Sequence, residues 1–115
     1  MTSRTDIGGL AHPADGTADA RESTRLSDRL AMAHDASHYL LVPQKVIRAT
    51  DATHIADIMA TAHRDGTSVT FRSGGTSLSG QAASNSVLVD TRRNFRRVTV
   101  LDGGLRVRCQ PGATV

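Results

Sequence analysis

An eleven-residue segment has the residue types that suit an anion-binding loop. Residues 72–82 read Arg-Ser-Gly-Gly-Thr-Ser-Leu-Ser-Gly-Gln-Ala and contain three glycines, several hydroxyl side chains and no acid. Glycines allow backbone N–H groups to turn inward and to approach a ligand closely. Thr76, Ser77 and Ser79 add hydroxyl donors. Arg72 adds a positive charge, so the composition predicts a diphosphate site, with a glycine- and serine-rich surface loop as the alternative.

The spacing of these glycines differs from both common nucleotide-binding loops. Gly75 and Gly80 have the spacing of the outer glycines of a P-loop. The next two residues, Gln81 and Ala82, stand where that loop requires Lys and then Ser or Thr. Without the lysine and the Mg²⁺-binding hydroxyl, a kinase or ATPase function is excluded. The pattern G-x-G-x-x-G of dinucleotide-binding folds is absent as well.

A strand–helix–strand unit leads into this loop. Val46–Arg48 and Ser68–Arg72 have the apolar and β-branched character of short strands. Between them Thr50 supplies an N-cap, and Gly66 supplies the left-handed residue after the last turn. Such a unit predicts parallel strands, and ligands bind at the carboxyl ends of parallel strands. The apolar residues at helical spacing are Ile55, Ile58, Met59 and Ala62.

An earlier helix is also expected, on the N-terminal side of this unit. Asp19 and Glu22 resemble a capping box, and Leu26, Leu30 and Ala33 follow at helical spacing. The polar remainder of this pattern is typical of a surface helix.

The second half of the chain changes character. Val87–Val89 predicts a strand buried on both faces. Arg97–Leu101 and Leu105–Gln110 alternate between apolar and polar residues, and Asp102–Gly104 between them predicts a tight hairpin. The expected fold class is therefore α+β, with a βαβ unit of short parallel strands followed by an antiparallel hairpin.

Ordered motifs along the chain resemble those of FAD-linked oxidases with a PCMH-type FAD-binding domain, the family that includes the flavoprotein of glycolate oxidase and the D-lactate dehydrogenases. The most similar pattern is that of the branch fused to an iron–sulfur region. Ser73 departs from the glycine that is commoner in this branch. Besides the loop and the βαβ unit that precedes it, the motifs are Asp35–Tyr39, Val42–Ile47, Val87–Asp90 and Gln110–Thr114.

The resemblance implies that the loop wraps the diphosphate of FAD, mainly through backbone N–H groups, with the hydroxyls of Thr76 and Ser77 assisting. Related enzymes with an R-S-G-G-H-S loop attach FAD covalently through that histidine. Thr76 stands at its place, which implies a non-covalent flavin. The implied cofactor-binding residues are Arg72, Ser73, Gly74, Gly75, Thr76, Ser77, Leu78, Ser79, Gly80 and Gln81.

The family also implies an activity for the parent protein, the oxidation of a small 2-hydroxy acid of the D-lactate or glycolate type. Its substrate residues lie beyond residue 115, so the chain is expected to be an incomplete and inactive part of an FAD-dependent dehydrogenase. The expected organisation is a flexible arm (1–18), a helix and connecting loop (19–45) and a partial FAD-binding domain (46–115). The alternatives are an inert truncated product and a non-catalytic basic module that binds through Arg92–Arg97.

Composition and charge narrow the possible partners and cellular location of the protein. The 115 residues suffice for one domain, and 14 basic against 11 acidic residues give a net charge of +3. A basic balance is compatible with nucleic-acid binding, but acids are spread through the chain and no nucleic-acid partner is expected. The chain has no apolar run long enough for a membrane span and no secretory signal, which predicts a cytoplasmic protein. Cys109, the single cysteine, is expected to be a small core residue.

The histidines are weak candidates for metal ligands. His34 and His38 have helical spacing, but no third ligand follows at the spacing of a metal site, so hydrogen-bonding roles are favoured and no metal is expected. His54 and His63 are both predicted to face solvent.

Overall fold

The computed structural model describes residues 19–114, so the arm expected over residues 1–18 lies outside the described residues. Its centre is a four-stranded sheet of order β1-β2-β4-β3. The strands are β1 (Glu22–Ser23), β2 (Lys45–Arg48), β3 (Val69–Arg72) and β4 (Val87–Asp90).

The predicted parallel strands are confirmed, and their order has a physical reason. β2 and β3 run parallel but are not neighbours, because β4 lies between them and pairs with both. β4 is the most apolar strand, and Leu88 and Val89 within it are fully buried. The central position covers both faces and both edges of this strand.

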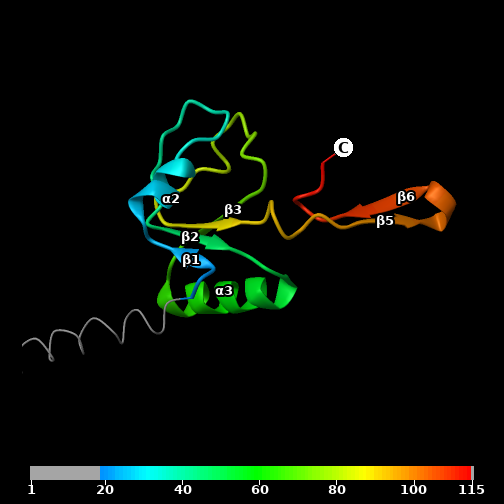
Figure 1. Ribbon diagram of the computed structural model, residues 1–115, viewed down its shortest axis with the longest axis horizontal. Helices are drawn as coiled ribbons and strands as arrows, with labels where there is room; N and C mark the ends of the chain where they lie inside the picture. The colour runs from blue at the N-terminus through cyan, green and yellow to red at the C-terminus, as the bar shows by residue number, and fades with distance from the viewer. Residues whose placement is uncertain (1–18, 115) are drawn as a thin grey trace, which may run out of the picture.

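Helix α3 (Ala52–Asp65) covers one face of the sheet (Figure 1). It packs Ile58 against a small core that includes Ile47, Val89 and Phe95. The predicted C-terminal residue is confirmed, since Gly66 has a left-handed backbone with φ of 66°. The predicted N-cap is wrong by one residue, because the residue that caps the helix is the one after Thr50.

The helix expected from Asp19 onward is also wrong in its first half. Residues 22–23 form β1, which pairs antiparallel with β2, and the helix α2 extends only over Leu26–Ala31. Glu22 does not cap a helix, because its Oε1 atom lies 2.8 Å from Nζ of Lys45 across the strand pair. Pairing with the edge of the sheet satisfies the backbone hydrogen bonds of residues 22–23. A short polar surface helix would have only marginal stability there.

The opposite face of the sheet carries α2 and two long loops (Figure 1). One loop joins α2 to β2, and the other, residues 73–86, joins β3 to β4. Arg29 in α2 anchors the first loop, since its Nε atom donates to the Pro43 carbonyl at 2.7 Å. The glycine-rich segment is therefore on the side of the sheet away from α3.

The predicted hairpin is confirmed as β5 (Val98–Leu101) and β6 (Arg106–Cys109), joined by the short 3₁₀ turn η1 (Asp102–Gly104). It projects from the sheet as a separate two-stranded ribbon (Figure 1). Every residue of β6 is exposed. The expectation that Cys109 is a core residue is thus wrong for the described part of the chain, because no other element packs on this ribbon.

Candidate functional site

The glycine-rich loop begins at the carboxyl end of β3. Thr91 fixes this starting point, because its backbone N–H and its Oγ1 hydroxyl both donate to the Arg72 carbonyl, at 2.8 and 3.1 Å. Thr91 directly follows β4, so the loop starts beside the end of the central strand. This is the edge of a parallel sheet at which ligands bind.

The guanidinium of Arg72 supports the loop from within the protein. Its Nη1 atom donates to the carbonyl oxygens of Met32, at 3.3 Å, and of His34. Gly75 lies directly against it, since a Cβ atom at Gly75 would come within 2.7 Å of the Arg72 Cζ atom. Gly75 also has a φ of 69°, a left-handed conformation that favours glycine. The charge of Arg72 is thus close to the loop, but its hydrogen bonds hold residues 32–34.

One of the predicted hydroxyl donors, Ser77, binds the chain itself, and so does the neighbouring hydroxyl of Ser73. The Oγ atom of Ser77 accepts from the backbone N–H groups of Ser79 and Gln81, at 3.3 and 3.1 Å. It also donates to Oε1 of Gln81 at 3.2 Å. The hydroxyl of Ser73 donates to the Pro111 carbonyl at 2.5 Å. These bonds shape the turn and tie the start of the loop to residue 111.

The backbone N–H groups of residues 74–78 have no acceptor among residues 19–114. A run of such donors in a glycine-rich turn forms an anion-binding concavity. Gly74 adds room, because a Cβ atom there would meet only the methyl carbon of Thr76, at an ordinary 3.6 Å. Leu78 is 80% exposed, so this part of the loop is open to a ligand. The loop therefore fits a diphosphate through its backbone.

A turn in the α2–β2 loop packs on the far end of the glycine-rich loop. The ring of Tyr39 lies so close to Gly80 that a Cβ atom there would come within 2.5 Å of Cδ2, and Gly80 has a φ of 76°. Asp35 organises this turn, because its Oδ1 atom accepts from the backbone N–H of Ser37 at 2.8 Å and from the Ser37 hydroxyl. These bonds, the hydroxyl first, hold the pKa of Asp35 below its usual value.

The predicted site residues are therefore brought together, but in different roles. Gly74, Thr76 and Leu78 present free donors or open surface, whereas Arg72 and Ser77 hold the loop in shape. The supporting contacts of Tyr39 and Asp35 were visible in the sequence only as part of the family motif. Nothing in their spacing from residues 72–82 predicts that the two loops touch.

The histidine predictions have mixed outcomes. Within residues 19–114 no group of three or more His, Cys, Asp or Glu side chains could hold a metal. His63 is exposed as predicted, but His54 is 8% exposed, which contradicts the prediction that it faces solvent. Its Nδ1 atom accepts from the backbone N–H of Thr50 at 3.2 Å. The first turn of α3 directs this ring toward the sheet rather than away from it.

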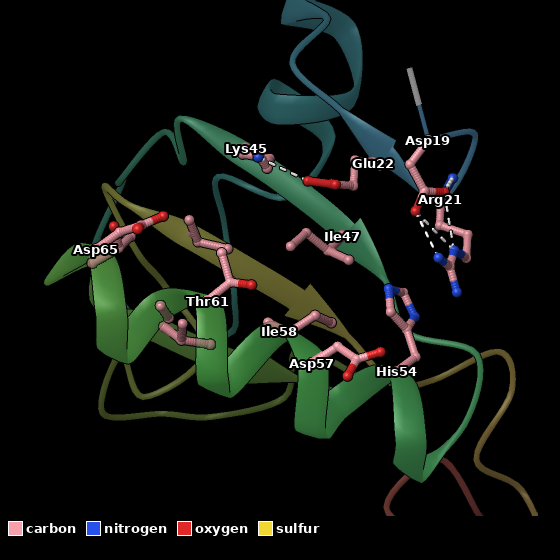
Figure 2. Close-up of a pocket in the computed structure, with 14 residues that line it drawn as sticks. Asp19, Arg21, Glu22, Lys45, Ile47, His54, Asp57, Ile58, Thr61 and Asp65 are labelled. Atoms are coloured by element: carbon pink, nitrogen blue, oxygen red, sulfur yellow. Dashed lines mark hydrogen bonds and ion pairs between the residues drawn. The ribbon is translucent and has the colours of Figure 1, made fainter. Parts of the chain in front are cut away.

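A cavity of about 280 Å³ lies between α3 and the β1–β2 edge of the sheet (Figure 2). Ile47 and Ile58 form its apolar base, and the pair of Glu22 and Lys45 crosses its rim. It is on the face opposite to the glycine-rich loop and shares no residue with it. This cavity has no part in the site described above.

These features define a class of protein, an α+β chain in which a parallel strand ends in a glycine-rich loop with a run of backbone N–H donors that have no acceptor among residues 19–114. A family model described as "FAD binding domain" matches residues 43–115. The chain belongs to this FAD-binding domain family. Within residues 19–114 no helix has the length and apolar character of a membrane span.

Curated relatives are enzymes of one kind. The chain is 35% identical over 91 residues to the D-2-hydroxyglutarate dehydrogenase of Escherichia coli (strain K12), covering 74% of this chain and 9% of the relative. It is 32% identical over 94 residues to the enzyme of the same name from Haemophilus influenzae, covering 78% of this chain and 9% of the relative. The chain thus spans about a tenth of the length of the curated relatives that it matches.

Solved structures share the fold. GilR, an oxidoreductase that catalyses the terminal step of gilvocarcin biosynthesis, superimposes with a TM-score of 0.60 at 22% identity, over 82% of this chain and 20% of GilR. The Bermuda grass pollen isoallergen BG60 gives a TM-score of 0.64 at 19% identity, over 90% of this chain and 24% of the allergen. Both likenesses show that the α+β arrangement is that of larger proteins.

Proposed function

We propose that residues 72–81 hold the diphosphate of a non-covalent FAD in a dehydrogenase that oxidises a 2-hydroxy acid. The observation that carries the proposal is the run of free N–H donors over residues 74–78, at the carboxyl end of a parallel strand in an FAD-binding domain. The names of the two curated relatives support a 2-hydroxy acid as the substrate class. The match over residues 43–115 supports the division of the chain near residue 46.

Each part of the loop has a distinct task in this proposal. The N–H groups of residues 74–78 donate to phosphate oxygens, and the Thr76 hydroxyl, which is exposed, adds a further donor. Ser77 and Gln81 fix the turn through their mutual hydrogen bonds. Arg72 positions the loop through its hydrogen bonds to the Met32 and His34 carbonyls. Gly75 leaves the space that the Arg72 guanidinium occupies, because a Cβ atom there would come within 2.7 Å of the Arg72 Cζ atom.

The proposal of a non-covalent flavin depends on the residue at position 76. Thr76 stands where the covalent relatives have histidine, and a threonine hydroxyl lacks the ring nitrogen that forms the histidyl link. Residues 72–81 would hold the diphosphate of the flavin, which would supply the hydride-accepting chemistry for oxidation of the 2-hydroxy acid. The described residues contribute binding and orientation of the cofactor. The proposal further places this chain in a cytoplasmic protein that also carries an iron–sulfur region, as the sequence pattern suggests.

The test is a titration of the full chain with FAD, followed by quenching of flavin fluorescence. Gly74→Asp introduces a carboxylate without steric strain, because the position has open space and an ordinary φ. Two like charges near 4 Å apart repel by about 1 to 4 kcal/mol, so we expect FAD affinity at least about tenfold weaker. Gly75→Asp is a poorer test, since its side chain would also displace Arg72.

Two control variants separate charge from shape. Gly74→Asn adds a neutral side chain of the same size and should retain most of the affinity. Gly103→Asp makes the same change as the test variant in the open hairpin turn, where φ is 63° and a Cβ atom meets nothing within 4 Å. Equal affinity of the native chain and Gly74→Asp for FAD, or equal weakening by Gly103→Asp, would contradict the proposal.

A further inference from the structure

A second hollow, lined mainly by arginines, lies at the same edge of the sheet as the glycine-rich loop. It has a volume of about 420 Å³ and shares no lining residue with residues 72–81. Arg48 ends β2 and Asp90 ends β4, so the hollow opens at the carboxyl ends of two parallel strands. Its full lining is Met32, Arg48, Asp90, Arg92, Arg93, Arg96, Gly112 and Thr114.

The lining carries an excess of positive charge. Four arginines face a single acid, Asp90. The side chains of Arg92, Arg93 and Arg96 are exposed and form no ion pair or hydrogen bond with residues 19–114. Arg48 approaches only Asp28, at 3.9 Å. Four guanidinium groups held around a single acid repel one another, and an anion between them relieves this repulsion.

The backbone that carries these arginines is fixed. Asn94 donates from Nδ2 to the Ala49 carbonyl at 2.9 Å, and Phe95 is 6% exposed in the core. Gly112 donates from its N–H to the Phe95 carbonyl at 2.6 Å. A Cβ atom at Gly112 would come within 2.8 Å of three carbonyl oxygens of residues 91–95, so only glycine fits there. The arginines therefore extend from a close-packed turn rather than from a loose tail.

We propose that this arginine pocket, defined by Arg48, Arg92, Arg93 and Arg96, binds a small anion with two or more negative charges. The planar guanidinium group pairs in a two-pronged manner with both carboxylate and phosphate, so the shared chemistry is that of a compact dianion. Met32 is the one large apolar side chain of the lining, and no aromatic ring is present to stack a base. The pocket thus suits a dicarboxylate or a pyrophosphate group rather than a nucleobase. This site is additional to the flavin loop and does not depend on it.

The experiment is isothermal titration calorimetry of the full chain at constant ionic strength, with inorganic pyrophosphate and, separately, with succinate. We expect saturable binding of at least one anion, and the tighter of the two identifies phosphate or carboxylate as the preferred group. Because the glycine-rich loop is proposed to hold a diphosphate as well, the variants below separate pyrophosphate bound there from pyrophosphate bound in the arginine pocket. Arg93→Gln and Arg96→Gln should each weaken this binding about tenfold, because each removes charge-assisted hydrogen bonds.

Two further variants locate the binding. Arg64→Gln, an exposed arginine of α3 on the opposite face of the sheet, is the matched control and should bind as the native chain does. Gly74→Asp should keep its affinity for pyrophosphate even though it loses FAD, which separates this proposal from that of the flavin loop. Far-ultraviolet circular dichroism of each variant checks that the fold is retained.

Three outcomes would overturn the proposal. The first is the absence of saturable binding of either anion. If a single-stranded oligonucleotide, titrated in the same way, binds while neither small anion does, the proposal is overturned as well. The second is equal weakening by Arg64→Gln. The third is loss of pyrophosphate binding in Gly74→Asp, which would place the anion in the glycine-rich loop.

Discussion

The guanidinium of Arg72 binds backbone carbonyls of the same chain, those of Met32 and His34. The loop that follows is thereby tied to the segment after α2, and Gly75 rests against the guanidinium. A positive charge inside an anion-binding loop thus acts first on the shape of that loop. This role would be missed if every basic residue near a phosphate site were assigned to the ligand.

Arg72→Ala tests this role. Hydrogen bonds from a charged group contribute about 1.5 to 3 kcal/mol, so we expect a loss of roughly that size in the free energy of unfolding, together with weaker FAD binding. Chemical denaturation and the FAD titration measure the two effects. A variant as stable as the native chain would show that the contacts with Met32 and His34 are not important.

Asp35 gives a pH dependence whose sign follows from its hydrogen bonds. The hydroxyl and N–H of Ser37 favour the charged carboxylate, so the pKa of Asp35 in the folded chain lies below its usual 3.8. Its contribution to stability is then complete above the pKa of the unfolded chain and is lost as the pH falls through the folded value.

We therefore expect Asp35→Asn to be less stable than the native chain at neutral pH, with the difference shrinking below pH 3.8. Thermal unfolding followed by circular dichroism across this range measures it. Since the pKa of Asp28 is also lowered, the Asp35→Asn variant should itself still lose some stability in acid. A difference that stays constant with pH would contradict this assignment.

At the scale of elements, the start of α3 shows how accurately the sequence predicts the first residue of a helix. Thr50 was the predicted N-cap, but the residue with extended backbone at the helix start is Asp51, whose side chain accepts from the His54 N–H at 2.8 Å. Both residue types favour this position, so composition alone does not choose between them. In the structure the Thr50 hydroxyl lies 3.3 Å from Nδ1 of the His54 ring and caps no backbone N–H of the helix, which leaves this role to Asp51.

The variants Asp51→Ala and Thr50→Ala distinguish the two assignments. Loss of an N-cap costs about 1 kcal/mol, so Asp51→Ala should lower the free energy of unfolding by about that amount. Asp51→Asn keeps an accepting oxygen and should recover most of it. Chemical denaturation compares the three, and a larger effect at Thr50 than at Asp51 would restore the original prediction.

At the scale of the whole molecule, the hairpin leaves an apolar face open. Register places Val98 opposite Cys109 and Val100 opposite Val107, so these four side chains share one face of the ribbon. Val98, Val100 and Val107 are 53%, 65% and 53% exposed. The strand edges are unpaired as well, and such edges favour pairing between chains.

We expect this chain to self-associate through the hairpin. Val100→Thr combined with Val107→Thr should reduce the association measured by analytical ultracentrifugation, while the free energy of unfolding changes by less than about 1 kcal/mol because both residues are already exposed. Thr99→Ser, on the other face of the ribbon, is the control. A monomeric native chain would show that the exposed face has no such effect.

Much of the fold was predictable because local patterns and tertiary demands agree. The apolar spacing of α3, the left-handed Gly66 and the uninterrupted apolar run of β4 each have one low-energy interpretation, and the structure confirms all three. The helix expected from Asp19 onward was wrong over its first half, because a polar helix and a short edge strand differ little in intrinsic preference there. Pairing with β2 decided it, and the sequence of that segment contains no sign of its partner.

For the glycine-rich loop, the sequence predicted the kind of ligand and the structure showed which groups could contact it. The sequence alone predicted that residues 72–82 suit a diphosphate, because glycines and hydroxyl groups without acids favour an anion, and it left a glycine- and serine-rich surface loop as the alternative. Only the tertiary structure decided which groups are free to bind. Arg72, Ser73 and Ser77 meet partners on other segments or within their own turn. Among residues 19–114, what remains for a ligand is the backbone of residues 74–78 and the exposed hydroxyl of Thr76. The four arginines converge on one hollow for the same reason. Arg48, at the end of β2, is distant in sequence from residues 92–96, which follow β4, and the pairing of β2 with β4 brings them to one edge of the sheet.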